Sequence, residues 1–160
     1  MSSVYFDTSV FLAIFNKEPS GPQIKALLRE LRRDRIRIYT SIITIEEVSV
    51  LSFRKGTRAD DNYIKVGKLA RIETITREIA LTAAKIEAQL IDLTPTKDQD
   101  DNRRRKWDCF HIATAMCLGC GTLYAEDSKL LRRKSQLSIT NMDFSLPRPK
   151  APELFAPDIP

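Results

Sequence analysis

Short apolar segments alternate along this chain with longer segments of helical periodicity, and this alternation constrains the fold more than any other feature. The apolar segments predict strands at residues 4–6, 36–39, 72–75, 122–125 and 136–139. Apolar spacing predicts helices at residues 10–15, 24–31, 42–51, 63–70 and 76–91, and a further helix that starts at Asp108. We therefore expect an α/β protein of three layers (α/β/α), with a central, mostly parallel sheet of about five strands.

The length of 160 residues fits one domain with one sizeable core. We expect this domain to span residues 1–146, and we expect the proline-rich residues 147–160 to form an extended or disordered tail. No apolar run reaches the roughly 18 residues of a membrane span, and the N-terminus lacks the basic region of a signal peptide. The expectation is a cytoplasmic protein without a membrane partner.

The cysteines are Cys109, Cys117 and Cys120, and the last two have the spacing of a redox or zinc pair. No second pair exists to complete a zinc site, and the one histidine of the sequence, His111, lies in the same predicted helix. We therefore interpret the cysteines as structural thiols in a reducing compartment.

Acidic residues occur where predicted strands end. Asp7 follows the strand at residues 4–6, Asp127 follows the strand at 122–125, and Asp108 is expected to open a helix. Strand ends of one polarity meet at one edge of a parallel sheet, which is where ligands bind in open α/β folds. On the helix at 42–51, Glu46 and Glu47 both have apolar neighbours four residues away, so periodicity does not choose between them.

Carboxylates gathered at one edge repel each other unless a cation neutralises them. Mg²⁺ prefers such oxygen ligands, and it can neutralise charge on a phosphodiester that is being cleaved. The formal net charge of +5 is weak evidence for nucleic acid by itself, but basic residues 103–106 and 132–134 bracket Asp108 and Asp127. The structural alternatives are a helix cap for Asp7 and a capping box between Thr44 and Glu47.

The residues at these positions resemble the PIN-domain ribonucleases, and the chain is most similar to the VapC-type toxins of toxin–antitoxin pairs. The resemblance is carried by residues 4–9, 41–48, 108–115 and 123–127, in the order in which the family has them. It implies a Rossmann-like PIN fold, Mg²⁺ or Mn²⁺ as cofactor, and endonucleolytic cleavage of RNA. It also implies a small antitoxin protein as partner and a homodimer.

The resemblance selects Glu47 over Glu46 and assigns a catalytic quartet of Asp7, Glu47, Asp108 and Asp127. It makes the three aspartates the metal ligands, gives Glu47 a water molecule or a second ion to hold, and lets Thr8 or Ser9 orient Asp7. The charge pattern adds an RNA-contacting set that consists of Arg103, Arg104, Arg105 and Lys106.

Two features depart from the family pattern. Ala125 stands where the family often has a hydroxyl residue, and residues 97–106 look like a loop that is longer and more charged than usual. A catalytically weak RNA-binding or assembly module and a DNA-directed nuclease therefore stay open as alternatives. His111 could lie near the metal or pack as an ordinary helix residue, and Trp107 could stack on a base or anchor the helix start.

Overall fold

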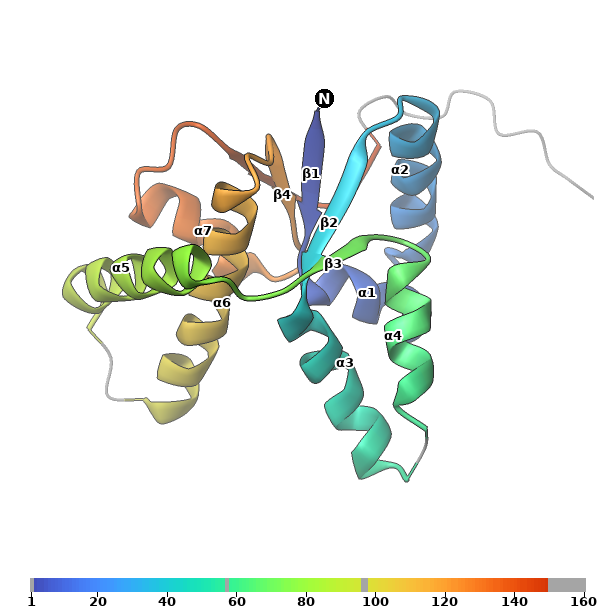
Figure 1. The fold of residues 1–160 in the computed structure, drawn as a ribbon, viewed down its shortest axis with the longest axis horizontal. Coiled ribbons are helices and arrows are strands. Elements are labelled where there is room, and N and C mark those ends of the chain that lie inside the picture. Colours follow the sequence, from blue (N-terminus) through green and yellow to red (C-terminus); the bar gives the residue numbers. More distant parts are fainter. Residues whose placement is uncertain (1, 57, 96–97, 150–160) are drawn as a thin grey trace, which may run out of the picture.

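The computed structural model describes residues 2–56, 58–95 and 98–149. In this part of the chain, five strands form one parallel sheet in the order β3-β2-β1-β4-β5 (Figure 1). The strands are β1 Ser3–Phe6, β2 Arg37–Ser41, β3 Arg71–Glu73, β4 Thr122–Tyr124 and β5 Asp143–Ser145. The predicted α/β class and its parallel sheet are confirmed.

Helices cover both faces of this sheet and make the three layers. The helices are α1 Thr8–Phe15, α2 Gly21–Arg33, α3 Ile42–Arg54, α4 Asp60–Gly67, α5 Arg77–Leu93, α6 Gln99–Cys117 and α7 Ser128–Gln136. In Figure 1, α1 to α4 lie to the right of the strands or below them, and α5 to α7 lie to their left. Each side of the sheet therefore has its own hydrophobic core.

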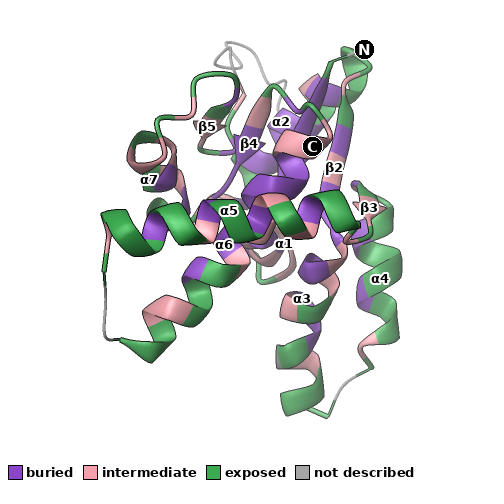
Figure 2. Cartoon of the chain, turned by 60° about the vertical axis from the view of Figure 1, so that its left-hand side comes forward, coloured by how far each residue is buried: buried purple, intermediate pink, exposed green. Residues whose placement is uncertain are grey.

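β1 lies at the centre of the sheet and contributes to both cores. Val4 and Phe6 pack with α1 and α2, while Tyr5 points to the other face and packs with α5 and α6. Side chains of a strand alternate between faces, so this short segment is buried on both sides. Figure 2 shows the buried residues along the strands and the inner faces of the helices. The end of β1 is thus held rigidly, because Tyr5 and Phe6 are fully buried.

The strand order reverses at β1. From β1 the chain builds β2 and β3 on one side, and it later adds β4 and β5 on the other side. Open parallel sheets bind their ligands at such a switch point, beyond the carboxyl ends of the strands. The carboxyl ends of β1 and β4 are therefore the place to look for a site.

The prediction that Asp108 opens a helix after a charged loop at residues 94–106 was wrong. α6 begins at Gln99, and the side chain of Asp98 caps it by accepting hydrogen bonds from the backbone N–H of Asp100 at 2.9 Å and of Asp101 at 3.4 Å. The first half of α6 is polar on nearly every side, so no apolar periodicity marks it in the sequence. Asp108 consequently lies in the middle of a long helix.

The prediction of a last strand at residues 136–139 was also wrong. Gln136 ends α7, and the final strand of the described residues is β5. Leu137 and Ile139 are partly buried against the core beneath α7, and Ser138 between them has a positive φ of 51°. The alternation of apolar and polar residues at 136–139 therefore comes from the turn after α7, in which Leu137 and Ile139 pack against the core.

Two of the three cysteines, Cys109 and Cys120, are buried, and Cys117 is half-buried. Cys109, Cys117 and Cys120 are free thiols. Burial raises the pKa of Cys109 to about 12 and that of Cys120 to about 11, so these thiols stay protonated at neutral pH. Among the described residues, no helix is long and apolar enough to cross a membrane. Most of the predicted tail, residues 150–160, lies outside the described part of the chain.

Candidate active site

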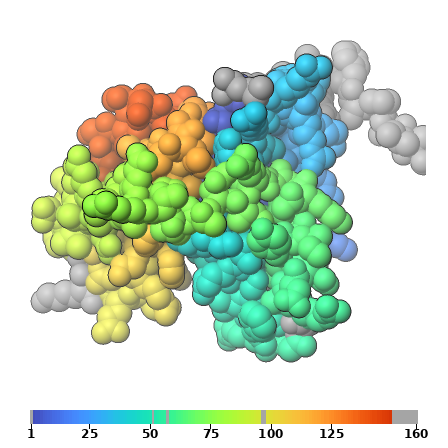
Figure 3. Space-filling model, viewed as in Figure 1, coloured from blue at the N-terminus to red at the C-terminus, as the bar shows by residue number. Residues whose placement is uncertain are grey.

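The four predicted acids line one cleft at the carboxyl edge of the sheet. Asp7 follows β1, Asp127 follows β4, Glu47 comes from α3 and Asp108 from α6, and all four border a cleft of about 560 Å³. Figure 3 shows the molecule hollowed between the yellow surface of α6 and the blue-green surface of α3. Asp7 and Asp127, which are 120 positions apart in the sequence, thus line the same cleft.

Asp7 is fixed in place by the start of α1. One carboxylate oxygen, Oδ2, accepts hydrogen bonds from the backbone N–H of Ser9 at 3.0 Å and from its hydroxyl at 2.6 Å. The Ser9 hydroxyl in turn accepts a hydrogen bond from the backbone N–H of Glu126 at 2.9 Å, which ties α1 to the segment after β4. Asp7 therefore caps the helix, and the expected orienting role of Ser9 is confirmed. Its other oxygen, Oδ1, lies 3.5 Å from His111 Nε2.

His111 joins three elements at the bottom of the cleft. Its Nε2 lies 3.0 Å from Glu47 Oε2, 3.3 Å from the Thr8 hydroxyl and 3.5 Å from Asp7 Oδ1. Its Nδ1 lies 2.7 Å from the hydroxyl of the fully buried Tyr5. At 2 % exposure, His111 is a buried polar group whose partners are all in the site. His111 is thus a packed helix residue, as one of the two interpretations expected, and it packs directly beside Asp7 and Glu47.

Hydroxyl groups support this arrangement from below. Thr8 donates a short hydrogen bond to Glu47, and its oxygen lies 3.1 Å from the Thr44 hydroxyl. Thr44 is 2.8 Å from Thr40, which donates to the carbonyl of Phe6 at 2.8 Å. The alternative of a Thr44–Glu47 capping box was wrong, because α3 begins at Ile42 and the Glu47 side chain turns toward Thr8. Glu46 is exposed, so the selection of Glu47 agrees with the contacts.

The charges at the bottom of the cleft shift each other's pKa values. Burial opposes a charge on His111, but Asp7 and Glu47 outweigh it and raise the pKa of His111 to about 9. Burial also opposes the charge on Glu47, yet the hydrogen bond and the charge of His111 hold its pKa below the usual range. The pair is therefore an imidazolium and a carboxylate at neutral pH.

Asp108 is the acid with the largest electrostatic cost. Burial raises its pKa to about 7, and the negative charges of Asp7 and Asp127 act in the same direction. Arg133 in α7 opposes this rise in pKa, since its Nε donates to Asp108 Oδ2 at 3.2 Å and its charge favours the carboxylate. Asp127 is exposed and caps α7 by accepting a hydrogen bond from the Lys129 N–H at 2.7 Å.

The donor chemistry of the cleft fits a hard divalent cation. Asp7, Asp108 and Asp127 offer carboxylate oxygens, and their mutual repulsion at Asp108 is the cost that a cation would remove. As the side chains stand, no group of three or more His, Cys, Asp or Glu residues in the described chain is arranged to hold a metal ion. The residues therefore have the right chemistry, and the side chains would have to draw together around an ion.

The four basic residues predicted to contact RNA do not all lie on one face of α6. Arg103, Arg104 and Trp107 line the cleft, and Lys106 is exposed beside them. Arg105 points to another face of the helix, is 5 % exposed, and donates to the Thr94 carbonyl at 3.0 Å and to the Asn102 side chain. We therefore do not place Arg105 on the surface that the other three form.

Trp107 and Arg133 complete the surroundings of Asp108. The Trp107 ring is half-buried and tilted against the ring of Phe110, with centroids 6.2 Å apart, so it both anchors α6 and offers an edge to the cleft. No sequence pattern marks Arg133 as the partner of Asp108, because a basic residue in a surface helix looks the same whether it faces solvent or an acid.

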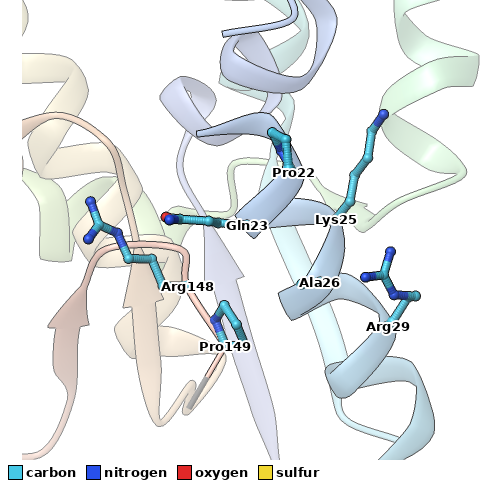
Figure 4. Close-up of a pocket in the computed structure, with 7 residues that line it drawn as sticks. All are labelled: Pro22, Gln23, Lys25, Ala26, Arg29, Arg148 and Pro149. Carbon is cyan, nitrogen blue, oxygen red and sulfur yellow. The ribbon is translucent and has the colours of Figure 1, made fainter. Parts of the chain in front are cut away.

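A larger cavity of about 710 Å³ lies away from the acids. Residues of α2 and the segment Arg148–Pro149 line it, and its lining includes Lys25, Arg29 and Arg148 but no carboxylate (Figure 4). Because size alone supplies no chemistry, we place the candidate active site in the acidic cleft.

A parallel sheet covered by helices, with an acidic cleft at its switch point, makes this an open α/β protein with its candidate site where such folds bind ligands. The PIN domain family model matches residues 4–136, and the chain belongs to this family. No relative was found among curated proteins by sequence.

Solved structures of similar fold are bacterial toxin–antitoxin proteins. The VapBC-1 structure from nontypeable Haemophilus influenzae superposes with a TM-score of 0.63 at 14 % identity, covering 91 % of this chain and 98 % of that chain. VapBC2 from Rickettsia felis, bound to a DNA fragment from the promoter, gives 0.61 at 17 % identity, covering 90 % and 98 %. VapC20 from Mycobacterium tuberculosis, a sarcin–ricin loop cleaving toxin, gives 0.58 at 19 % identity, covering 91 % and 99 %. At these identities the likeness concerns the fold.

Proposed function

We propose that this protein is a divalent-metal-dependent endoribonuclease and the toxin of a toxin–antitoxin pair. The observation that carries the proposal is the convergence of Asp7, Glu47, Asp108 and Asp127 on one cleft whose rim holds Arg103 and Arg104. The family and the toxins of similar fold, one of which cleaves the sarcin–ricin loop, support the same reading.

In the proposed mechanism, Asp7, Asp108 and Asp127 would hold Mg²⁺ or Mn²⁺, which when bound would supply Lewis-acid chemistry at the scissile phosphate. Glu47, kept ionised and oriented by His111 and Thr8, accepts a proton from the attacking water. Arg133 limits the repulsion among the aspartates by its bond to Asp108.

The basic rim brings the substrate to acids that would otherwise repel it. Arg103, Arg104 and Lys106 neutralise phosphates on either side of the cleaved bond, and Trp107 offers a ring on which a base can stack. A DNA-directed nuclease would use the same acids, so substrate choice is part of the experiment below.

The proposed protein partners are a small antitoxin and a second copy of the chain. The similar structures from Haemophilus influenzae and Rickettsia felis are VapBC proteins. On this chain, Phe53, Tyr63 and Ile64 expose 72 %, 55 % and 56 % of their surface on the neighbouring helices α3 and α4. Exposed apolar groups gathered in this way are typical of protein-binding surfaces. The free thiols agree with a cytoplasmic location.

The decisive experiment incubates the protein with pooled tRNA, mRNA and matched single-stranded DNA in EDTA, Mg²⁺ or Mn²⁺. We expect RNA cleavage only with metal, and a loss of roughly 100-fold or more in Asp7→Asn, Glu47→Gln and Asp108→Asn. Glu78→Gln is the matched control, since Glu78 is an exposed glutamate at the start of α5 that does not line the cleft, and it should cleave like the unmodified protein. Metal-dependent cleavage that survives Asp7→Asn or Asp108→Asn in a folded protein would refute the proposal.

A further inference from the structure

A smaller cavity of about 180 Å³ lies beside the acidic cleft, where the end of α5, the first half of α6 and α7 meet. Its lining carries four cationic side chains, Arg105, Lys129, Arg132 and Arg133, and one acid, Asp101. The residues of α6 that border it are spaced at i and i+4, which puts them on one face of the helix. This face differs from the one that carries Arg103 and Arg104 into the cleft.

The positive charge of this cavity is only partly neutralised. Asp101 Oδ1 is paired with Lys129 at 2.9 Å, and Arg133 is paired with Asp108 outside the cavity lining. Arg105 and Arg132 form no ion pair within the part of the chain that the structure describes. The pKa of Asp101 is lowered, first by Lys129 and then by the charges of Arg133 and Arg105. The cavity is therefore a place of surplus positive charge.

Arg105 supplies a second, independent observation. The residue is 5 % exposed, and the terminal nitrogens of its guanidinium donate to the Thr94 carbonyl and the Asn102 side chain, both of which are neutral. Its Nε is buried and has no acceptor among the described residues. Buried donors are nearly always satisfied in folded proteins, so this nitrogen calls for an acceptor that the described residues do not supply, and its positive charge favours an anionic one.

We propose that this cavity binds one phosphate group of the RNA backbone, adjacent to the phosphate that is cleaved. The proposal rests on the proposed ribonuclease function, since it names a substrate contact of that enzyme. Arg133 connects the two places directly, because it lines the cavity while its Nε bonds to Asp108. An RNA strand whose phosphate contacts Arg105 and Arg132 would therefore cross α6 beside the acidic cleft.

The first test needs no RNA and no catalysis. Inorganic phosphate is titrated into the full-length protein in EDTA, and binding is measured by isothermal titration calorimetry. We expect one saturable site, weakened roughly tenfold by Arg132→Gln, because Arg132 is exposed and its loss removes one unpaired charge. Arg37→Gln is the matched control. Arg37 is an exposed arginine at the amino-terminal end of β2 and does not line the cavity, so its variant should bind phosphate unchanged.

A second variant tests the orphan donor. Arg105→Lys keeps the charge but removes Nε, and it should also weaken phosphate binding while its thermal unfolding stays cooperative. Equal phosphate binding by the unmodified protein, Arg132→Gln and Arg105→Lys would overturn the proposal. So would the absence of any saturable binding, and both results would leave the metal-dependent cleavage assay unaffected.

The third measurement distinguishes a backbone phosphate from a free one. Binding of a labelled single-stranded RNA in EDTA is followed at several salt concentrations, and each lost phosphate contact lowers the slope of log K against log salt by about 0.7. Arg132→Gln should lower the slope by about one such contact, and Arg37→Gln should not. An unchanged slope in Arg132→Gln would assign the cavity to a free phosphate and overturn the RNA-backbone proposal.

Discussion

His111 contacts side chains from every element that forms the bottom of the acidic cleft. Tyr5 comes from β1, Thr8 from α1 and Glu47 from α3, and the imidazole of α6 lies within 3.3 Å of a polar atom of each. A side chain with this many fixed neighbours has little rotational freedom, and it restricts Glu47 in the same way. We infer that His111 is a positioning residue for Glu47.

Replacing His111 tests this role. Gln keeps a donor close to the place of Nε2, whereas Ala removes it, so we expect His111→Gln to retain most of the RNA cleavage rate and His111→Ala to lose roughly 10- to 100-fold. Single-turnover cleavage with saturating Mg²⁺ measures the rates, and thermal unfolding controls for stability. If both variants lost the same activity, His111 would be needed for more than the hydrogen bond to Glu47.

The sequence predicted the acids of the site better than their partners. Asp7 and Asp127 follow strands, and the end of a strand is legible in apolar patterning, so their convergence was foreseeable. Arg133 donates a hydrogen bond to Asp108, which lies 25 positions earlier in the sequence. The hydroxyl groups of Thr40, Thr44 and Thr8 form a hydrogen-bonded row that no sequence pattern marks. Contacts of this kind depend on how helices pack, which the local sequence does not encode.

At the scale of elements, α6 is the helix whose start was predicted wrongly from the sequence. It is also the helix that contributes most side chains to the site. Its first half carries Arg103, Arg104 and Arg105, and its second half carries Asp108 and His111. The first half has no apolar stripe, so its helical form depends on its cap and its own charges. The Asp98 side chain supplies the cap, and Asp100 forms an ion pair with Arg103 at 3.1 Å.

Removing the cap should therefore loosen the basic half of α6. We expect Asp98→Ala to lower the free energy of unfolding by about 0.5–2 kcal/mol and to reduce hydrogen-exchange protection at residues 99–106. Asp98→Asn is the matched control, because Asn caps helices about as well as Asp. Equal protection in all three proteins would show that packing, rather than the cap, holds this segment helical.

At the scale of the whole molecule, the buried ionisable groups make stability depend on pH. The pKa of His111 is raised from 6.5 to about 9, so the folded protein holds this proton more tightly than the unfolded chain. Its stabilising contribution is complete below pH 6.5 and is lost as the pH rises through 9. The raised pKa of Asp108, about 7, acts with the same sign at lower pH, from about 4 to 7.

We therefore expect the metal-free protein to lose on the order of 2 kcal/mol of unfolding free energy between pH 6.5 and 9. Urea unfolding in EDTA at these two pH values measures the change. His111→Gln has no group that titrates at this position, so its stability should vary much less over the same interval. A similar decline in both proteins would assign the effect to other groups.

The global architecture was the most predictable level. Strands bordered by helices allow few arrangements, because parallel crossovers are right-handed and each face of the sheet must be covered. The boundaries were less certain, as β5 at Asp143–Ser145 and the turn at residues 136–139 show. A three-residue strand carries too little pattern to be separated from a turn whose apolar residues face the core.

The acidic cleft draws its groups from residues 7, 47, 108 and 127, and the last of these follows β4, which pairs with β1 on the side opposite to β2. A chain still being synthesised therefore holds no complete centre until β4 has left the ribosome and docked. Fragments released by premature termination before residue 127 therefore lack part of the acidic quartet.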